Sequence, residues 1–116
     1  MRLRGLTAAL GLLMLSACTH AESQTPSRRD LVGEGRALVE VYCISCHAIG
    51  AAGESRLAEA PPFRTLSERY PITALEEAFA EGVLVGHPAM PEFRLEPDQI
   101  DALVAYLESI QPRRGG

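Results

Sequence analysis

The stretch "VYCISCH" at residues 41–47 decides how the rest of this 116-residue chain is interpreted. Two cysteines are separated by two residues, and a histidine follows the second cysteine directly. Such a group can be a redox-active dithiol, half of a zinc site or the attachment point of a larger group. The choice between them depends on which other ligands the chain offers and on the structure expected around the motif.

Two of these interpretations fit poorly. A structural zinc site needs four ligands, but after His47 the only further Cys or His is His87. A thioredoxin-like dithiol is expected in a strand–helix–strand setting, whereas the residues around this motif have helical periodicity. The Cys-x-x-Cys-His spacing is instead typical of c-type haem attachment, in which Cys43 and Cys46 form thioethers to the haem vinyl groups. The motif therefore predicts one covalently bound haem c, with His47 as an axial ligand of its iron.

An iron bound by His47 has a second axial position. The two earlier methionines lie in an N-terminal segment that we expect to be removed, which leaves Met90 in the mature chain. Met90 stands between two prolines that restrict the backbone of its loop. Because His/Met ligation is a known cytochrome c pairing that raises the reduction potential, we predict Met90 as the second ligand. The alternative is His87, three residues earlier in the same loop.

Residues 1–17 have the pattern of a secretory signal peptide, because Arg2 and Arg4 precede an apolar run too short to span a bilayer. The following "LSAC" at residues 15–18 resembles the lipobox of bacterial lipoproteins. This resemblance implies cleavage before Cys18, lipidation of that cysteine and attachment to a membrane. The alternative is ordinary cleavage a few residues later, with Cys18 lost. In both cases we expect the protein to be exported to the periplasm.

The mature chain divides into three parts. The polar residues 18–27 are predicted to form a flexible tether, residues 28–112 the folded domain, and residues 113–116 a tail. A domain of this size buries a limited core, and the chain has no tryptophan and only three phenylalanines. A porphyrin enclosed by the helices would supply the missing apolar centre.

The charge of the chain limits its partners. Its eleven basic residues are all arginines, and without Arg2 and Arg4 they face fifteen acidic residues, which leaves a net charge near −6. An acidic surface argues against binding to nucleic acid. It favours redox partner proteins, membrane-bound or not, that have a basic face or dock through apolar contact.

Helical periodicity occurs in three segments, at residues 30–46, 73–82 and 97–112, and a shorter helical turn is expected at residues 63–70. No segment shows the sustained alternation of a strand. We therefore predict an all-α fold, in which three main helices and a short one wrap around one haem.

The expected helix ends follow from local signals. Asp30 is predicted to cap the first helix, and Thr73 with Glu76 has the spacing of a capping box. Gly82 is expected to end the second helix, and Pro97 suits the first position of the third. The expected apolar face of the first helix consists of Leu31, Gly35, Leu38, Val39 and Tyr42.

Over residues 30–110 the chain resembles a small class I cytochrome c. The stretch "GEGRALVEVYCISCH" at residues 33–47 is similar to the first helix of that family running into the haem motif, and "QIDALVAYLESI" at residues 99–110 is similar to its last helix. The resemblance implies a cytochrome c fold in which these two helices cross. The positions that match the family's helix crossing are Gly35, Leu103 and Tyr106.

Two loops also match the family. "APPF" at residues 60–63 resembles the loop whose proline faces the iron-binding histidine, which implies that the carbonyl of Pro61 accepts a hydrogen bond from Nδ1 of His47. Pro62 is the alternative partner. "HPAMPEF" at residues 87–93 resembles the family's methionine loop. Mitochondrial members dock through lysines around the haem edge, but this chain has no lysine, so their partners are not carried over.

The resemblance implies an electron carrier and not an enzyme, because two protein ligands leave the iron no open position for a substrate. One alternative is a haem sensor or enzyme in which Met90 leaves the iron. Another is a haem subunit of a membrane or dehydrogenase complex. The sequence shows no pair of carboxylates and no nucleophile–base set that would indicate a different chemistry.

Overall fold

The structure is a computed structural model that describes residues 24–82, 89–92 and 94–113 of the chain. Within these residues all the regular structure is helical, and no strand is formed. The elements are the helices α1 (Arg28–Tyr42), α2 (Ala74–Glu81) and α3 (Pro97–Ile110), and the short 3₁₀ helix η1 (Phe63–Glu68). The predicted all-α class is confirmed, and η1 stands where the short helical turn was expected.

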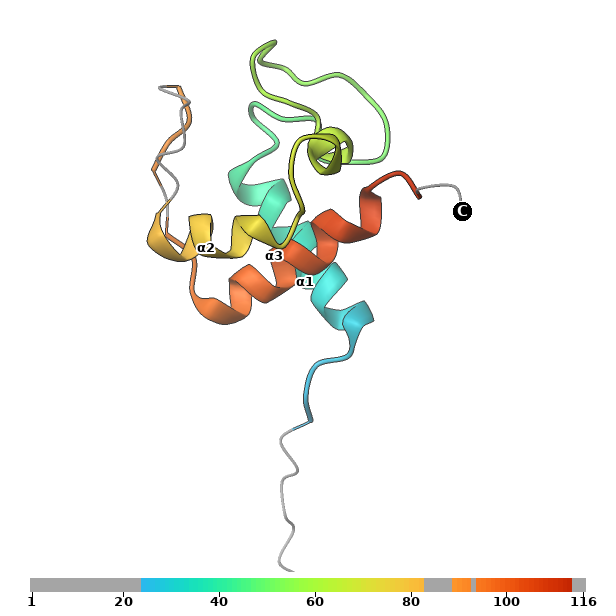
Figure 1. The fold of residues 1–116 in the computed structure, drawn as a ribbon, viewed down its shortest axis with the longest axis vertical. Coiled ribbons are helices and arrows are strands. Elements are labelled where there is room, and N and C mark those ends of the chain that lie inside the picture. The colour runs from blue at the N-terminus through green and yellow to red at the C-terminus, as the bar shows by residue number, and fades with distance from the viewer. Residues whose placement is uncertain (1–23, 83–88, 93, 114–116) are drawn as a thin grey trace, which may run out of the picture.

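Helices α1 and α3 cross at the centre of the molecule (Figure 1). The crossing is closest at Gly35, where a Cβ atom would overlap the carbonyl oxygen of Ala102 and lie 2.7 Å from Cβ of Tyr106. Only glycine lets the two backbones approach so closely. The expectation that Gly35 lies at the crossing of the first and last helices is therefore confirmed.

The beginning of α1 differs from the prediction. Ser27, not Asp30, is the N-cap, and the helix starts at Arg28. The N–H of Asp30 donates to the hydroxyl of Ser27 at 3.3 Å, and Oδ2 of Asp30 accepts from the N–H of Ser27 at 3.0 Å. Asp30 is thus the acidic partner of a capping box, because the serine three residues earlier has the extended backbone that a cap requires.

The end of α1 also differs, because the helix was predicted to run through both cysteines and ends at Tyr42. The carbonyl of Val39 accepts from the N–H groups of both Cys43 and Ile44, at 3.0 and 3.1 Å, so the helical path widens there. A separate turn follows, in which the N–H of His47 donates to the carbonyl of Cys43 at 2.9 Å. Tyr42 was predicted to lie on the apolar face of this helix, but it is 51% exposed.

Helix α2 lies within the predicted range and differs only in its N-terminal cap, whereas α3 begins as predicted and ends at Ile110, two residues before the end of the predicted range. Thr73 precedes α2 in a helical conformation, and its side chain caps no N–H group, so the predicted capping box with Glu76 is wrong. Gly82 ends α2 at a φ of 90°, a left-handed conformation that glycine adopts at little cost. Pro97 is the first residue of α3, as predicted.

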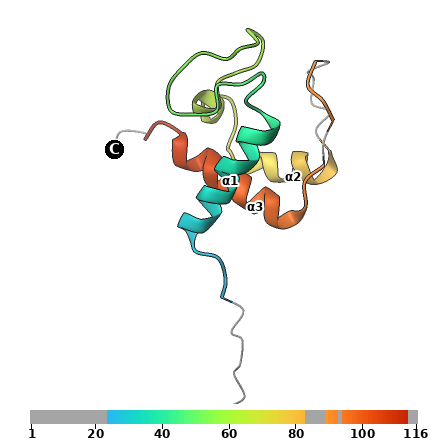
Figure 2. The same cartoon turned by 180° about the vertical axis from the view of Figure 1, so that it is seen from behind.

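The core lies between α3 and the elements around it, with α1, α2 and η1 all in contact with α3 (Figure 2). Leu103 and Tyr106 are 3% and 7% exposed, which confirms that they are packing positions. The buried cluster consists of Val39, Phe63, Leu66, Ile72, Phe79, Leu95, Ile100, Leu103, Val104, Tyr106 and Leu107.

The loop between the cysteine motif and η1 is fastened at several points. The hydroxyl of Tyr106 donates to the carbonyl of Ile49 at 2.8 Å, which ties the start of the loop to α3. The N–H of Ala48 donates to the hydroxyl of Ser55 at 3.0 Å, and Arg64 of η1 donates to the carbonyl of Gly53 at 2.8 Å. The loop therefore has a defined course although it contains no helix or strand.

The predicted signal segment, Cys18 and His87 lie outside the described residues. Within the described part of the chain, every helix is too short or too polar to cross a bilayer.

Candidate functional site

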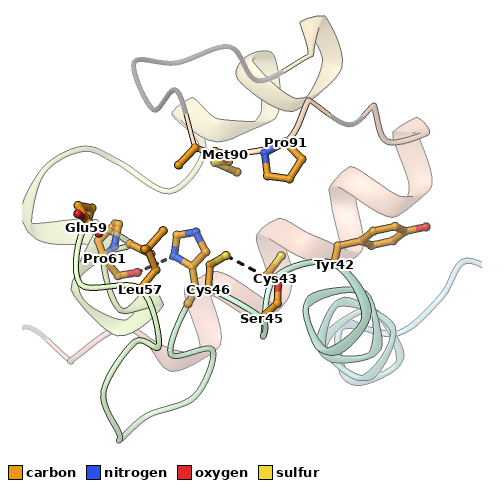
Figure 3. A pocket seen from close by; sticks show the side chains of 12 residues that line it. Tyr42, Cys43, Ser45, Cys46, Leu57, Glu59, Pro61, Met90 and Pro91 are labelled. Atoms are coloured by element: carbon orange, nitrogen blue, oxygen red, sulfur yellow. Dashed lines mark hydrogen bonds between the residues drawn. The ribbon is translucent and has the colours of Figure 1, made fainter.

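A cavity lies between the turn that carries the two cysteines and the segment that carries Met90. It has two compartments of about 380 and 370 Å³ that share Cys43, His47, Pro61 and Met90 as lining residues. Figure 3 shows Met90 and Pro91 across the cavity from Cys43 and Cys46. The fold thus brings together three parts of the chain that the sequence analysis had linked to one cofactor.

The two compartments have different walls. Polar groups border the first, where Tyr42, Ser45 and Glu59 are exposed. The second lies against the core, and its walls come from η1, α2 and α3. Its apolar lining residues are Phe63, Leu66, Ala74, Leu75, Ala78, Phe79, Leu103 and Leu107, and Tyr70 also lines it. A flat, largely apolar group that spanned both compartments would have one edge beside exposed polar residues and the other against the apolar core.

Cys43 and Cys46 are both free thiols and half-buried on the same side of the cavity (Figure 3). Burial and, to a smaller extent, the neighbouring Cys46 together raise the pKa of the Cys43 thiol to about 11. Redox-active dithiols depend on a thiol whose pKa is lowered, because the thiolate is the nucleophile. The environment of Cys43 therefore does not favour the dithiol interpretation.

His47 is held by a hydrogen bond and a ring contact. Its Nδ1 lies 2.8 Å from the carbonyl oxygen of Pro61, and its ring centroid lies 4.7 Å from that of Phe63, with the planes tilted by 38°. A donor bond at Nδ1 fixes the tautomer and leaves Nε2 as the nitrogen that can bind a metal. The carbonyl of Pro62 instead accepts from the N–H and hydroxyl of Thr65, so the geometry selects Pro61 of the two prolines.

The zinc interpretation gains no support from the arrangement of ligands. In the parts of the chain that the structure describes, no three side chains of His, Cys, Asp or Glu gather at a position that could hold a metal ion. His87 lies outside those parts. Met90 is half-buried and lines both compartments, as His47 does. Within the described residues, its thioether is therefore the candidate for the second iron ligand.

Several contributors to the site were not predicted. Phe63 was expected only as the start of a helical turn, but its ring packs on His47. Tyr106 was expected as a packing residue, but its hydroxyl also holds the loop that follows His47. A buried tyrosine hydroxyl usually finds a hydrogen-bond partner, so the sequence indicates that Tyr106 forms such a bond. It does not indicate which group accepts it. No sequence pattern indicated the contact between Phe63 and His47.

The donor set fits a covalently bound haem. Two free thiols lie together on one wall, a histidine ring is oriented by its Nδ1, a thioether stands opposite, and the inner walls are apolar. These features, on an all-helical domain in which α1 and α3 cross, define a small c-type cytochrome.

Comparison with known proteins agrees with this class. Residues 30–107 match the family model described as cytochrome C oxidase, cbb3-type, subunit III, and the chain belongs to this family. No curated protein and no solved structure matches the chain. A c-type cytochrome domain of this family binds haem c covalently. The chain is therefore an electron-transfer protein and not an enzyme.

Proposed function

We propose that the chain is a monohaem cytochrome that carries single electrons between redox partner proteins in the periplasm, with His47 and Met90 as the two axial ligands of the haem iron. One observation carries this proposal: His47 and Met90 line both compartments of the cavity that the two free cysteines also line. A closed iron site with two protein ligands suits electron transfer, since no position is left for a substrate.

Each residue has a defined part in this function. Cys43 and Cys46 hold haem c through thioether bonds, and haem c supplies the one-electron redox couple. The hydrogen bond to Pro61 orients His47 and makes its ring a stronger ligand. The soft thioether of Met90 favours the reduced iron and raises the reduction potential.

The walls of the cavity also tune the potential. The residues from η1, α2 and α3 give the second compartment largely apolar walls. A dry, apolar surrounding disfavours the extra positive charge of the oxidised site. The exposed rim near Tyr42 and Glu59 leaves one edge accessible to a partner.

The ligand assignment is tested by two matched variants of the holoprotein, Met90→Ala and His87→Ala. Visible spectra are recorded for the reduced protein with and without carbon monoxide, and the potential is measured by redox titration. We expect Met90→Ala to bind carbon monoxide promptly and to have a lower potential, whereas His87→Ala should keep the wild-type spectrum.

The opposite pattern would assign His87 as the ligand. Prompt binding of carbon monoxide by the unmodified reduced protein would contradict a closed site and would indicate a ligand-binding sensor or enzyme. Unchanged spectra in both variants would show that neither residue binds the iron.

The membrane attachment has a separate test. The proposed anchor is a lipid on Cys18, which follows a signal segment at residues 1–17. Cys18→Ser should release the holoprotein from the membrane fraction into the soluble periplasm. If the wild-type protein is already soluble, the lipid anchor is wrong while the redox function is unaffected. If the variant stays with the membrane, something other than a lipid on Cys18 holds the protein there.

The family description favours a second candidate function. Because the matching family is named for a subunit of a membrane oxidase, the chain could serve as a haem subunit of a membrane complex and not as a mobile carrier. Mild detergent extraction followed by native gel electrophoresis distinguishes the two roles. A carrier migrates alone, whereas a subunit migrates in a large assembly with other haem proteins, and Cys18→Ser should not release it.

A further inference from the structure

Gln111 has an unusual set of contacts for a residue at the end of a helix. It follows α3 directly, and its half-buried side chain makes three hydrogen bonds to the backbone. Its Nε2 donates to the carbonyls of Phe63 and Leu107, both at 2.8 Å, and its Oε1 accepts from the N–H of Ser67 at 3.0 Å. The carboxamide thus uses both of its N–H donors and its oxygen acceptor.

These bonds fasten η1 to the end of α3. Phe63 is the first residue of η1 and Ser67 its fifth, so one side chain holds both ends of the short helix. A glutamate at this position would keep the acceptor but would turn a carboxylate toward two carbonyl oxygens. A methionine would have a similar shape but would form none of the three bonds.

The segment that Gln111 holds is the one that contacts His47. The N–H of Phe63 donates to the carbonyl of Ala48, next to His47, at 2.9 Å. The Phe63 ring packs on the imidazole, and Pro61, two residues earlier, accepts from Nδ1 of His47. The backbone of Phe63 is therefore fixed on one side by the loop after His47 and on the other by Gln111.

We propose that Gln111 is a positioning residue for the iron ligand, which keeps the imidazole of His47 oriented by holding Phe63 and Pro61 in place through η1. This inference rests on the proposed role of His47 as an axial ligand. It gives the end of α3 a part in orienting the iron ligand, although the end of α3 belongs neither to the haem motif nor to the methionine loop. Loss of the carboxamide should loosen the bond between His47 and Pro61 although neither residue is changed.

The test compares Gln111→Glu and Gln111→Met with Gln99→Glu in the reduced holoprotein. Gln99 is a matched control, because its Oε1 accepts from the N–H of Glu96 at 3.0 Å and a glutamate oxygen can take over that bond. Gln99→Glu also adds the same charge to α3 as Gln111→Glu does. Gln111→Met removes the bonds without any change of charge.

The main readout is the exchange of the His47 Nδ1 hydrogen with deuterium, followed by NMR at temperatures where each variant is folded. We expect exchange about tenfold faster in both Gln111 variants, the factor that corresponds to the loss of roughly one net hydrogen bond from the segment. Gln99→Glu should exchange at the wild-type rate. The shifts of the haem methyl groups in the oxidised protein should change in both Gln111 variants and stay unchanged in the control.

The proposal is overturned if both Gln111 variants melt at lower temperature but keep the wild-type exchange rate and methyl shifts, since Gln111 would then be only structural. Failure of the ligand assignment looks different. If His47 does not bind the iron, its ring protons in the unmodified reduced protein lack the upfield shifts that a haem ring imposes on an axial ligand.

Discussion

The backbone of Gly35 in α1 lies directly against that of Ala102 in α3, so that no side chain fits between the two helices at this point. One turn further along α3 is Tyr106, whose Cβ would lie 2.7 Å from a Cβ at Gly35. The hydroxyl of the same tyrosine holds the loop that follows His47. The side chain of Tyr106 therefore joins the helix crossing to the loop of the candidate haem site.

Gly35→Ala should destabilise the holoprotein by about 1–3 kcal/mol, because the added methyl group must push apart two backbones that cannot move independently. The control is Gly33→Ala, in the same helix, where a Cβ meets nothing within 4 Å. That substitution should stabilise the protein by about 0.5–1 kcal/mol, since alanine is the better helix former. Denaturant unfolding of the holoprotein measures both changes. Equal effects of the two substitutions would contradict the tight crossing.

The sequence was most informative where one local signal had one structural meaning. The start of α3 followed from Pro97 and its buried face from its apolar stripe, and the end of α2 followed from Gly82. The Cys-x-x-Cys-His motif indicated the cofactor because its spacing matches the two vinyl groups and the iron. Gly35 required a reason for glycine inside a helix, and the structure gives that reason as close packing.

The errors arose where two signals compete for one helix end. Asp30 can cap a helix, but Ser27 can also cap it, and only the course of the chain decides which residue is extended. Thr73 and Glu76 have the spacing of a capping box, yet Thr73 has a helical backbone, and its carbonyl, not its hydroxyl, accepts from the N–H of Glu76.

Contacts between residues that are far apart in the chain could not be predicted from the sequence. The bonds of Gln111 join residues 44 and 48 positions apart in the chain. No periodicity or motif spacing reports such a pairing, which depends on how η1 and the end of α3 meet. The same applies to the ring of Phe63 on His47.

Tyr106→Phe should destabilise the holoprotein by about 0.5–1.5 kcal/mol, the usual net worth of a hydrogen bond. The variant loses the bond to the carbonyl of Ile49 and keeps the ring in the core. Tyr70→Phe is the control, because Tyr70 is 37% exposed. A loss for Tyr70→Phe as large as that for Tyr106→Phe would contradict a specific role of the Tyr106 hydroxyl.

The same substitution should change the alkaline limb of the stability curve. Burial raises the pKa of the Tyr106 hydroxyl above its ordinary value, Arg36 lowers it in part and Glu40 adds to the rise. Because the folded pKa is the higher one, the stabilisation is complete below the unfolded pKa, near 10. It is lost as the pH rises toward the folded value. Tyr106→Phe should therefore lose less stability above about pH 10 than the wild-type protein does.

Asp30→Asn should flatten the acid limb of the stability curve. The pKa of the Asp30 carboxyl is lowered by its hydrogen bonds to the side chain and backbone of Ser27. A lowered folded pKa means that the stabilisation is present above the unfolded value, near 4, and is lost as the pH falls toward the folded value. The measurement is denaturant unfolding at several acid pH values, with Asp101→Asn as a control for the loss of one exposed charge. Parallel acid limbs in Asp30→Asn and the wild-type protein would show that the ionised carboxylate of Asp30 adds nothing to the stability of the folded state.

Replacement of the two cysteines tests the attachment of haem directly. Cys43 and Cys46 are separate free thiols on one wall of the cavity, so each should form its own thioether. Cys43→Ser and Cys46→Ser should each keep haem covalently bound through the remaining sulfur, with the absorption band shifted because one vinyl group stays unsaturated. The double variant should lose its colour after acid denaturation and solvent extraction, and its mass should equal that of the polypeptide alone. Ser45→Ala is a suitable control, because it lies between the cysteines and should retain both thioethers. Haem that stays attached in the double variant, or is extracted from the wild-type protein, would overturn the assignment of both sulfurs.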